Sequence, residues 1–285
     1  MSWNGTFEIF QYQPFAEVYA RHTRRRCVKI GEDWGYLSSV GGLGATTLGI
    51  YNCPGSGPEA LTRLRDAALQ HKVARLWANL LECPSGPACG RVERLDTLTI
   101  DLTPSEPVLW KQIGSNTRWK IRRCLKDAVT IKVADTTDFE AWWTLYCKIA
   151  YKKAFSRQPR ALVEDLVHRT DLTTLLVAKC SSGRVIGGMF FLNHQYPVYW
   201  LGAFERGGPV NTGQLTLWES LLHFKQRGFT ILDLGGVERD PKHGPSEFKR
   251  AFHGEPRSTY ACTVVLDPIR NGVLKAGAWI RAVLS

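Results

Sequence analysis

The chain has 285 residues, of which 44% are hydrophobic and 22% charged, and this composition excludes a largely disordered protein. Its net charge of +11 favours an anionic partner such as a polyphosphate, a nucleic acid or an anionic lipid surface. No apolar run reaches the length of a membrane-spanning helix, and the first residues lack the pattern of a signal peptide. We therefore expect a cytoplasmic protein without an integral membrane segment.

In the first half of the chain, the pattern predicts a strand, a Gly-rich loop, a helix and another strand. The first strand is expected at Trp34–Leu37, and the loop over Gly41–Gly57 contains a strand-like piece at Thr46–Tyr51. The helix is expected over Pro58–His71, because Pro suits the first turn of a helix. The strand Val73–Leu81 follows it.

A capping box is predicted where the two halves meet. Thr99–Leu102 ends a strand, and Thr103, Pro104 and Glu106 then occupy the N-cap, N1 and N3 positions of a helix. We place the boundary here, with one lobe over 1–103 and a second over 104–268. Residues 269–285 are expected to form a helix packed on the body.

The next predicted helix, Thr117–Lys126, is strongly basic. Arg118, Arg122 and Lys126 recur every four residues, and no acidic residue within the helix compensates them. Guanidinium groups bind phosphate bidentately, so this stripe is either a phosphate-binding surface or a solvated helix face. The positions expected to face the core are Ile121, Cys124 and Leu125.

The second half repeats the order of the first. Its predicted elements are the hairpin strands Thr173–Lys179 and Arg184–His194, the strand Val198–Phe204, the helix Gln214–Arg227 and the strand Thr230–Gly236. A strand, a Gly-rich loop, a helix and a strand thus occur twice. Two copies of one α/β unit and chance recurrence of a common pattern both explain this order.

The loop Arg206–Gly213 lies before a helix, where Gly-rich loops can bind pyrophosphate through backbone amides. Pro209 removes one amide donor, and the basic-x-x-Gly-x-Gly pattern of coenzyme A sites is broken. A plain connecting loop explains these residues equally well. The broken pattern is mild evidence against coenzyme A as the carrier of the acyl group.

Phe248 and Phe252 flank Lys249, soon after the stretch Asp233–Val237. A lysine beside aromatic side chains is partly desolvated, which strengthens its ammonium as an electrostatic donor. The alternative is a surface lysine between core phenylalanines. The sequence contains no known nucleophile or metalloprotease motif, so we expect no covalent enzyme intermediate.

The eight cysteines show no disulfide-framework spacing, and Cys83 and Cys89 lack a His pair at zinc-finger spacing. We expect reduced thiols, no metal and no cofactor.

Taken together, these motifs resemble the Fem-like branch of the GNAT superfamily. The stretches that carry the resemblance are, in chain order, Ile100–Glu106, Leu109–Lys111, Thr117–Arg123, Tyr199–Ala203, Asn211–Leu215, Leu217–Glu219, Asp233–Val237 and Phe248–Phe252. The resemblance implies an α/β fold of two tandem GNAT-like lobes, each a mixed, mostly antiparallel sheet flanked by helices. The long coiled-coil arm of the large Fem proteins has no counterpart in this sequence.

The resemblance also implies an aminoacyltransferase, which moves an amino acid from aminoacyl-tRNA to an amine of a peptide, a peptidoglycan precursor or a peptide natural product. Lys249 matches the lysine thought to stabilise the oxyanion, and Asp101 is the nearest candidate for an acidic residue of the first lobe. Asp233 or a substrate group would accept the amine proton.

The remaining site residues are expected in two groups. The expected substrate-binding residues are Phe248, Trp200, Asn211, Tyr199 and Glu219. The expected tRNA- or phosphate-binding residues are Arg118, Arg122, Arg123, Lys126 and Arg250.

Three alternatives stay open. The first is an N-acyltransferase of the same fold that uses acyl-CoA, and the second is a non-catalytic RNA-binding module. The third is an enzyme acting at a membrane surface, which rests on a modest amphipathic pattern over Asp267–Ser285.

Overall fold

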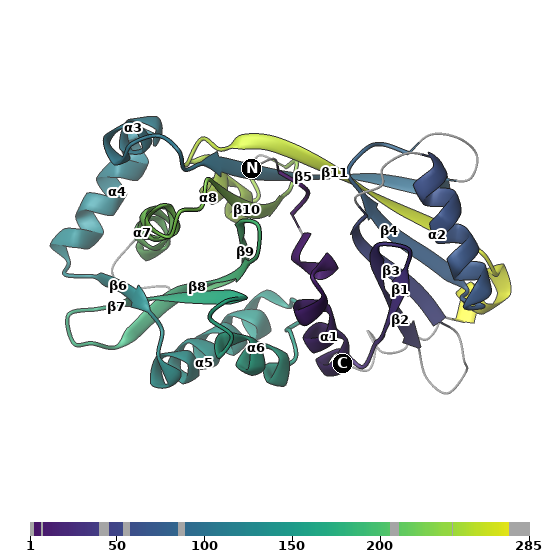
Figure 1. Cartoon of the computed structure of the whole chain (residues 1–285). Helices are drawn as coiled ribbons and strands as arrows, with labels where there is room; N and C mark the ends of the chain where they lie inside the picture. Colours follow the sequence, from purple (N-terminus) through teal and green to yellow (C-terminus); the bar gives the residue numbers. More distant parts are fainter. Residues whose placement is uncertain are drawn as a thin grey trace. The chain divides into compact units, whose positions relative to one another are not determined.

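The computed structural model of the chain forms two compact units (Figure 1). Unit 1 comprises residues 1–3 and 96–257, and unit 2 comprises residues 4–95 and 258–285. The structure describes residues 3–6, 8–39, 46–53, 58–84, 89–205, 211–240 and 242–273.

The fold is α/β, as predicted, with one large mixed sheet flanked by helices. Its hydrogen-bonded strand order is β1-β2-β3-β4-β11-β5-β10-β9-β8-β7-β6. Strands β5 (Arg91–Asp101) and β11 (Glu255–Val265) contribute residues to both units. Among the described residues, the longest helix is α5 (Thr136–Lys153), with 18 residues.

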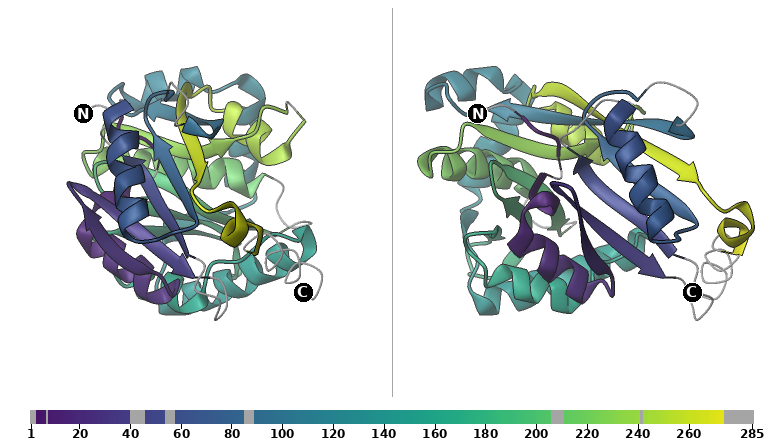
Figure 2. Two further views of the ribbon diagram at one scale, coloured as in Figure 1. Left: turned by 90° about the vertical axis from the view of Figure 1, so that its right-hand side faces the viewer. Right: turned by 45° about the vertical axis from the view of Figure 1, so that its right-hand side comes forward.

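Unit 2 places helices on the two faces of its strands. Its elements are η1 (Glu8–Gln11), α1 (Gln13–His22), β1 (Arg26–Ile30), β2 (Asp33–Ser39), β3 (Thr46–Cys53), α2 (Pro58–Gln70) and β4 (Arg75–Leu80). Leu37, Leu48 and Ile50 share a core with α2, which lies along these strands in Figure 2. Tyr36 and Tyr51 point the other way and pack against Phe10 of η1. This division follows from the alternation of side chains along a strand.

Unit 1 contains the remaining elements. They are α3 (Glu106–Gln112), α4 (Ser115–Lys126), β6 (Thr130–Val133), α5, α6 (Arg160–Val167), β7 (Thr173–Lys179), β8 (Val185–Asn193), β9 (Pro197–Phe204), α7 (Thr212–Gln226), β10 (Ile231–Val237) and α8 (Gly244–Arg250). On one face of β8, Phe190 stacks on Trp142 of α5. On the other face, Phe191 packs edge-on against Phe224 of α7.

Each unit contains a parallel pair of strands joined by a helix. In unit 2, β3 pairs parallel with β4 and α2 connects them. In unit 1, β9 pairs parallel with β10 and α7 connects them. Parallel neighbours require such a crossover, whereas antiparallel ones can be joined by a tight turn. The predicted repetition of strand, helix and strand is therefore a repetition of crossover units.

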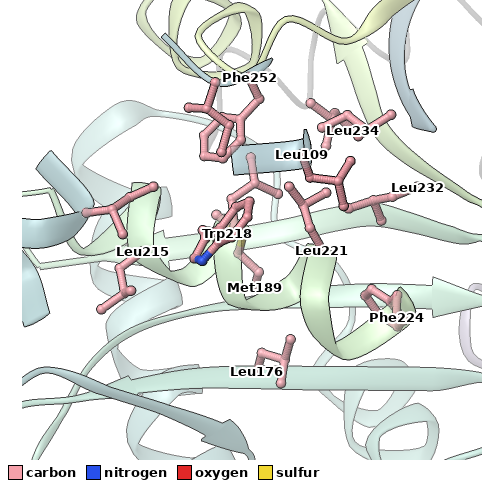
Figure 3. Close-up of a cluster of buried hydrophobic side chains, with 14 of the residues drawn as sticks. Leu109, Leu176, Met189, Leu215, Trp218, Leu221, Phe224, Leu232, Leu234 and Phe252 are labelled. Atoms are coloured by element: carbon pink, nitrogen blue, oxygen red, sulfur yellow. The ribbon is translucent and has the colours of Figure 1, made fainter. Parts of the chain in front are cut away.

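The core of unit 1 is built around α7 (Figure 3). Trp218 and Leu221 of α7 lie with Leu232 and Leu234 of β10 and with Phe252, which follows α8. The relative exposure of all five side chains is 5% or less. Truncating one such leucine to Ala typically destabilises a protein by about 2–5 kcal/mol. This core holds β10 and α8 in place, and these two elements carry Asp233 and Lys249.

The predicted capping box is wrong. Helix α3 begins at Glu106 with Ser105 as its N-cap residue, and no side chain caps it. The Thr103 hydroxyl instead donates to Oδ1 of Asp101 at 2.7 Å, and the Thr103 amide donates to the same oxygen at 2.8 Å. A turn around the Asp101 carboxylate therefore replaces the cap, because the short Asp side chain competes for the same backbone groups.

Helix α4 forms as predicted, but Leu125 does not face the core. Its side chain is 53% exposed, whereas Thr117, Ile121 and Cys124 are buried. Thr117 thus takes the place on the buried face that was expected for Leu125.

The C-terminal segment is described only in part. Residues 268–273 are helical, and Arg270 donates to the carbonyl of Lys72 at 2.8 Å. The rest of the helix predicted over 269–285 lies outside the described residues. Within the described ranges, no helix has both the length and the apolar character needed to cross a bilayer. All eight cysteines are free thiols.

Candidate active site

The candidate site lies where the parallel strands β9 and β10 meet. In this pairing, Asp233 of β10 lies opposite Val198 of β9. Strand β9 bulges at Trp200, since Phe191 lies opposite Tyr199 and Phe190 opposite Leu201. Strand β10 has an irregularity between Asp233 and Gly236 in its pairing with β5. Bulges interrupt the ladder and redirect side chains, and they are frequent next to active sites.

Lys249 reaches this point from the last turn of α8. Its Nζ donates to the Gly236 carbonyl at 2.8 Å and lies 5.4 Å from the centre of the Tyr199 ring. The side chain is half-buried, and burial lowers the pKa of Lys249 to about 8 although the negative charge of Asp233 opposes this. At neutral pH the amine is therefore mainly an ammonium in a partly dry setting, where its charge interacts more strongly than in water.

Asp233 is fully buried, and both of its carboxylate oxygens accept hydrogen bonds. Its Oδ1 accepts from the Thr97 hydroxyl at 2.5 Å and from the Gly235 amide at 2.7 Å, and its Oδ2 accepts from Nε1 of Trp3 at 2.9 Å. Donors of this kind stabilise the ionised form of a carboxylate. With its oxygens held in this way, Asp233 is better placed to orient the site than to collect a proton from a substrate.

Two glycines let Tyr199 lie against Lys249. A side chain at Gly202 would collide with the Tyr199 hydroxyl, and a Cβ at Gly235 would lie 2.7 Å from the Tyr199 carbonyl oxygen. Gly235 also has a φ of +71°, which favours glycine. Burial raises the pKa of Tyr199, so the hydroxyl stays protonated and can serve as a donor.

Three further predicted substrate-binding residues, Phe248, Asn211 and Trp200, differ in where they lie. Phe248 packs edge-on against Phe252, and a Cβ on Gly213 would be 3.5 Å from its ring. Asn211 precedes α7 in a left-handed conformation with a φ of 79°. Trp200 lies on the opposite face of the sheet from Tyr199. The Trp200 ring centre is 6.0 Å from that of Phe190, whereas the Tyr199 ring packs against Phe191. The structure therefore brings Tyr199 to Lys249 and turns Trp200 away from it.

Asp101 and Glu219 are associated with α3 rather than with Lys249. Asp101 lies opposite Ile231, which begins β10 and is five positions before Gly236. The Asp101 carboxylate accepts a hydrogen bond in the turn that leads into α3. Glu219 of α7 is half-buried, and burial together with repulsion from Glu106 of α3 raises its pKa. The structure thus does not bring either carboxylate to the lysine.

The predicted phosphate-binding residues differ in what their charges contact. Arg118 donates to the carbonyls of Trp110, Lys111 and Ile113 at the end of α3. Arg250 donates to the carbonyls of Glu238 and Asp240. Both guanidinium groups thus contact the backbone, Arg118 through Nη1 and Arg250 through Nη1 and Nη2.

The other predicted phosphate-binding residues of α4 are exposed. Arg122 lies over the Trp110 ring at 5.5 Å, and Arg123 makes a 3.6 Å ion pair with Asp127. Lys126 is exposed, and so is the Trp119 side chain at 61%. Trp119, Arg122, Arg123 and Lys126 fall at i, i+3, i+4 and i+7, so they share one helix face. We call these four residues the α4 face.

Three residues of the site were not predicted from the sequence. Trp3 and Thr97 are distant from Asp233 along the chain, by 230 and 136 positions, and nothing in the local pattern links them to it. Trp119 lies inside the basic helix, and its place on the cationic face follows from helical spacing alone. Among the described residues, no group of three His, Cys, Asp or Glu side chains is arranged to hold a metal ion.

An acetyltransferase (GNAT) domain matches residues 114–250, which include α4, β9, β10 and Lys249. No curated protein sequence matches the chain.

Solved structures share the fold at low sequence identity. The structure of FemX has a TM-score of 0.69 at 13% identity and covers 87% of this chain and 90% of its own. L-PGS from Bacillus licheniformis has a TM-score of 0.62 at 10% identity and covers 99% of both chains. The C-terminal domain of a putative lysylphosphatidylglycerol synthetase from Agrobacterium fabrum has a TM-score of 0.60 at 11% identity. It covers 89% of this chain and 91% of its own. Residues 114–250 therefore match a GNAT domain, and the chain shares the fold of FemX.

Proposed function

We propose that the protein is an aminoacyltransferase that moves an amino acid from aminoacyl-tRNA to the amine of a peptide, a peptidoglycan precursor or a peptide natural product. The GNAT domain match and the Fem-like fold support an acyltransferase in general. The observation that carries the finer proposal is the half-buried Lys249, held between Tyr199 and the Gly236 carbonyl beside a fully buried carboxylate. A cation in this setting can meet negative charge that develops on a substrate.

The proposed reaction forms an amide bond and breaks an ester bond. The neutral amine of the acceptor attacks the ester carbonyl, and the Lys249 ammonium stabilises the oxyanion that forms. As the tetrahedral intermediate collapses, the ribose oxygen leaves and takes up the proton that the amine gives up. An ester is already activated, so orientation and one or two fixed donors can supply most of the rate. In this scheme Asp233 holds the site in place and does not accept the proton.

We further propose that both units are GNAT-like lobes. Support comes from the parallel crossover found in each unit, β3-α2-β4 and β9-α7-β10. In this arrangement the second lobe would contain the acyl-transfer site.

The donor can be identified by an assay that separates aminoacyl-tRNA from acyl-CoA. We expect the protein to transfer an amino acid from a pool of charged tRNAs to an amine acceptor, and we expect ribonuclease added beforehand to abolish the product. Mass spectrometry of the acceptor is the measurement. Product formed from acyl-CoA and unaffected by ribonuclease would identify the acyl-CoA N-acyltransferase instead, and RNA binding without turnover of either donor would identify a binding module.

The α4 face is the proposed contact for the single-stranded 3′ end of the tRNA. Its three cations suit phosphates, and its exposed Trp119 offers a surface on which a base can stack. A lipid surface fits less well, because the apolar side of α4, with Ile121 and Cys124, is already buried in the core. The face therefore combines charge with an aromatic ring and lacks a free apolar side.

Variants of the α4 face should separate these two contributions. Replacing Arg122, Arg123 and Lys126 by Ala is expected to flatten the slope of log K against log salt by about 2, since each phosphate contact with a single strand contributes about 0.7. Trp119→Ala is expected to weaken binding about tenfold without changing this slope. Fluorescence anisotropy of a labelled tRNA measures both quantities.

The matched control is on α5, where Tyr151 is 92% exposed and is followed by the exposed Lys152 and Lys153. Replacing these three residues by Ala should leave binding unchanged. Equal effects of the two sets would mean that the contact is non-specific attraction to net charge, and the α4 face would then have no special role.

A further inference from the structure

The C-terminal end of α5 carries a concentration of positive charge. Between positions 141 and 163 the sequence contains five cations and no Asp or Glu. One of them, Arg160, pairs with Glu140 at 2.6 Å and with Glu164 at 3.6 Å. The other four are exposed and make no ion pair with any described residue: Lys148, Lys152, Lys153 and Arg157. Their charge is therefore available to an anionic partner.

Two exposed aromatic side chains lie among these cations along the chain. Tyr151 is 92% exposed and Phe155 is 39% exposed. Lys148, Tyr151 and Lys152 fall at i, i+3 and i+4, so they share one face of the helix. We call the four cations and the two rings the α5 end.

The turn that follows the helix is tied to a buried side chain. Ala154 adopts a left-handed conformation with a φ of 52°, and the Phe155 amide donates to the Ala150 carbonyl at 3.2 Å. The Phe155 ring lies 5.8 Å from the ring of buried Tyr146, whose hydroxyl accepts from the Gln158 amide at 3.4 Å. The exposed rings and charges thus project from an ordered helix end.

Stabilisation of the helix explains only part of this charge. The C-terminal end of a helix carries a negative partial charge, which favours cations in its last turn. Lys152 and Lys153 occupy that turn. Lys148 lies one turn earlier and Arg157 lies beyond the helix, and a protruding tyrosine contributes nothing to this interaction. The combination of cations and rings therefore indicates a partner outside the chain.

We propose that the α5 end is a contact surface for an anionic lipid bilayer. Lysines and arginines near a membrane are attracted by anionic headgroups, and aromatic rings are favoured at the level of these headgroups. Lipids diffuse sideways, so their headgroups can follow cations that have no regular spacing. This contact involves no substrate and does not rest on the proposed function.

The exposure of Tyr151 favours a bilayer over a nucleic acid. A base stacks on one face of a ring, and holding a mobile side chain in that single orientation costs conformational entropy. Trp119 of the α4 face is 61% exposed, so the protein supports part of it, whereas Tyr151 at 92% has little protein against it. Headgroups accept such a ring in many orientations, and this entropic cost is then small.

Helix α5 lies on the face of the sheet opposite the candidate site. Its Trp142 stacks on Phe190 of β8, whereas Tyr199, which lies beside Lys249, packs against Phe191. Successive side chains of a strand point to opposite faces. A bilayer at the α5 end would therefore not cover Lys249.

The test is sedimentation of the full-length protein with vesicles, made either of phosphatidylcholine alone or of phosphatidylcholine with phosphatidylglycerol. We expect binding to the anionic vesicles only, and we expect high salt to abolish it by screening. Replacing Lys148, Lys152 and Lys153 by Ala should lower this binding about 100-fold, since each cation near an anionic surface contributes about fivefold. Tyr151→Ala should lower it about fivefold without changing its salt dependence.

The matched control removes the same charge elsewhere. The α4 face variant with Arg122, Arg123 and Lys126 replaced by Ala should bind anionic vesicles like the wild type. Equal losses in the two triple variants, equal binding to both kinds of vesicle, or no binding to anionic vesicles at low salt would each overturn the proposal. If the α5 triple variant lost affinity for tRNA and kept its affinity for vesicles, the α5 end would be an RNA contact instead.

Discussion

Replacing Lys249 by Met is expected to lower kcat for amide formation by about 10²–10³-fold, which is the usual effect of removing one oxyanion donor. The variant should stay folded, because Met is unbranched and fits a half-buried position next to Tyr199. Steady-state kinetics with saturating donor measure the effect. A kcat close to that of the wild type would remove Lys249 from the mechanism.

The same substitution should also stabilise the protein. Since the folded-state pKa of Lys249, about 8, is lower than the ordinary 10.5, the unfolded state binds more protons between these values and stability rises with pH across that window. Below pH 8 the full effect of burying the charge is present, and Lys249→Met relieves it. We expect the free energy of unfolding at pH 7 to rise by about 1–3 kcal/mol. The control is Lys242→Met, which replaces an exposed lysine just before α8 and should change neither quantity.

Replacing Gly235 by Ala is expected to destabilise the protein by about 2–5 kcal/mol and to abolish activity. The new Cβ would lie 2.7 Å from the Tyr199 carbonyl oxygen, which is backbone and cannot move aside, and the residue would be held at a φ of +71°. Left-handed strain and overpacking each add about 1–3 kcal/mol. Thermal melting and the transfer assay are the measurements.

The adjacent glycine provides the matched control. A Cβ on Gly236 would meet no atom within 4 Å, and Gly236 is not among the residues with positive φ. Gly236→Ala should therefore keep both the fold and the activity. If the two variants had the same stability and activity, the close approach of Gly235 to the Tyr199 carbonyl would not matter for the packing of β10 against β9.

The strands and helices of unit 1 were predictable because their signals are local. The hairpin Thr173–Lys179 with its return strand and the helix before β10 follow from alternation, helical spacing and the glycine at the turn. The capping box failed because Thr103 had two possible partners, and the sequence does not show that Asp101 takes its hydroxyl. Short polar residues often have such competing local bonds.

The candidate site was predictable only in part. The aromatic neighbours of Lys249 indicate partial desolvation, and the lysine is indeed half-buried with a lowered pKa. Two of the donors to Asp233 belong to Trp3 and Thr97, which no local pattern connects to it. The contact that Arg118 makes was not predictable for a related reason. A basic stripe in the sequence does not show that one guanidinium donates to the backbone carbonyls at the end of α3.

The return of β11 to unit 2 has a consequence for synthesis on the ribosome. Residues 4–95 emerge early, but β4 obtains its antiparallel neighbour only when Tyr260–Val265 has been made. Until then, while residues 96–257 are being made, β4 has an open edge of the kind that attracts other chains. Chaperone binding to nascent chains is therefore expected to persist until translation has passed residue 265, and chains stopped before residue 258 should aggregate through this edge.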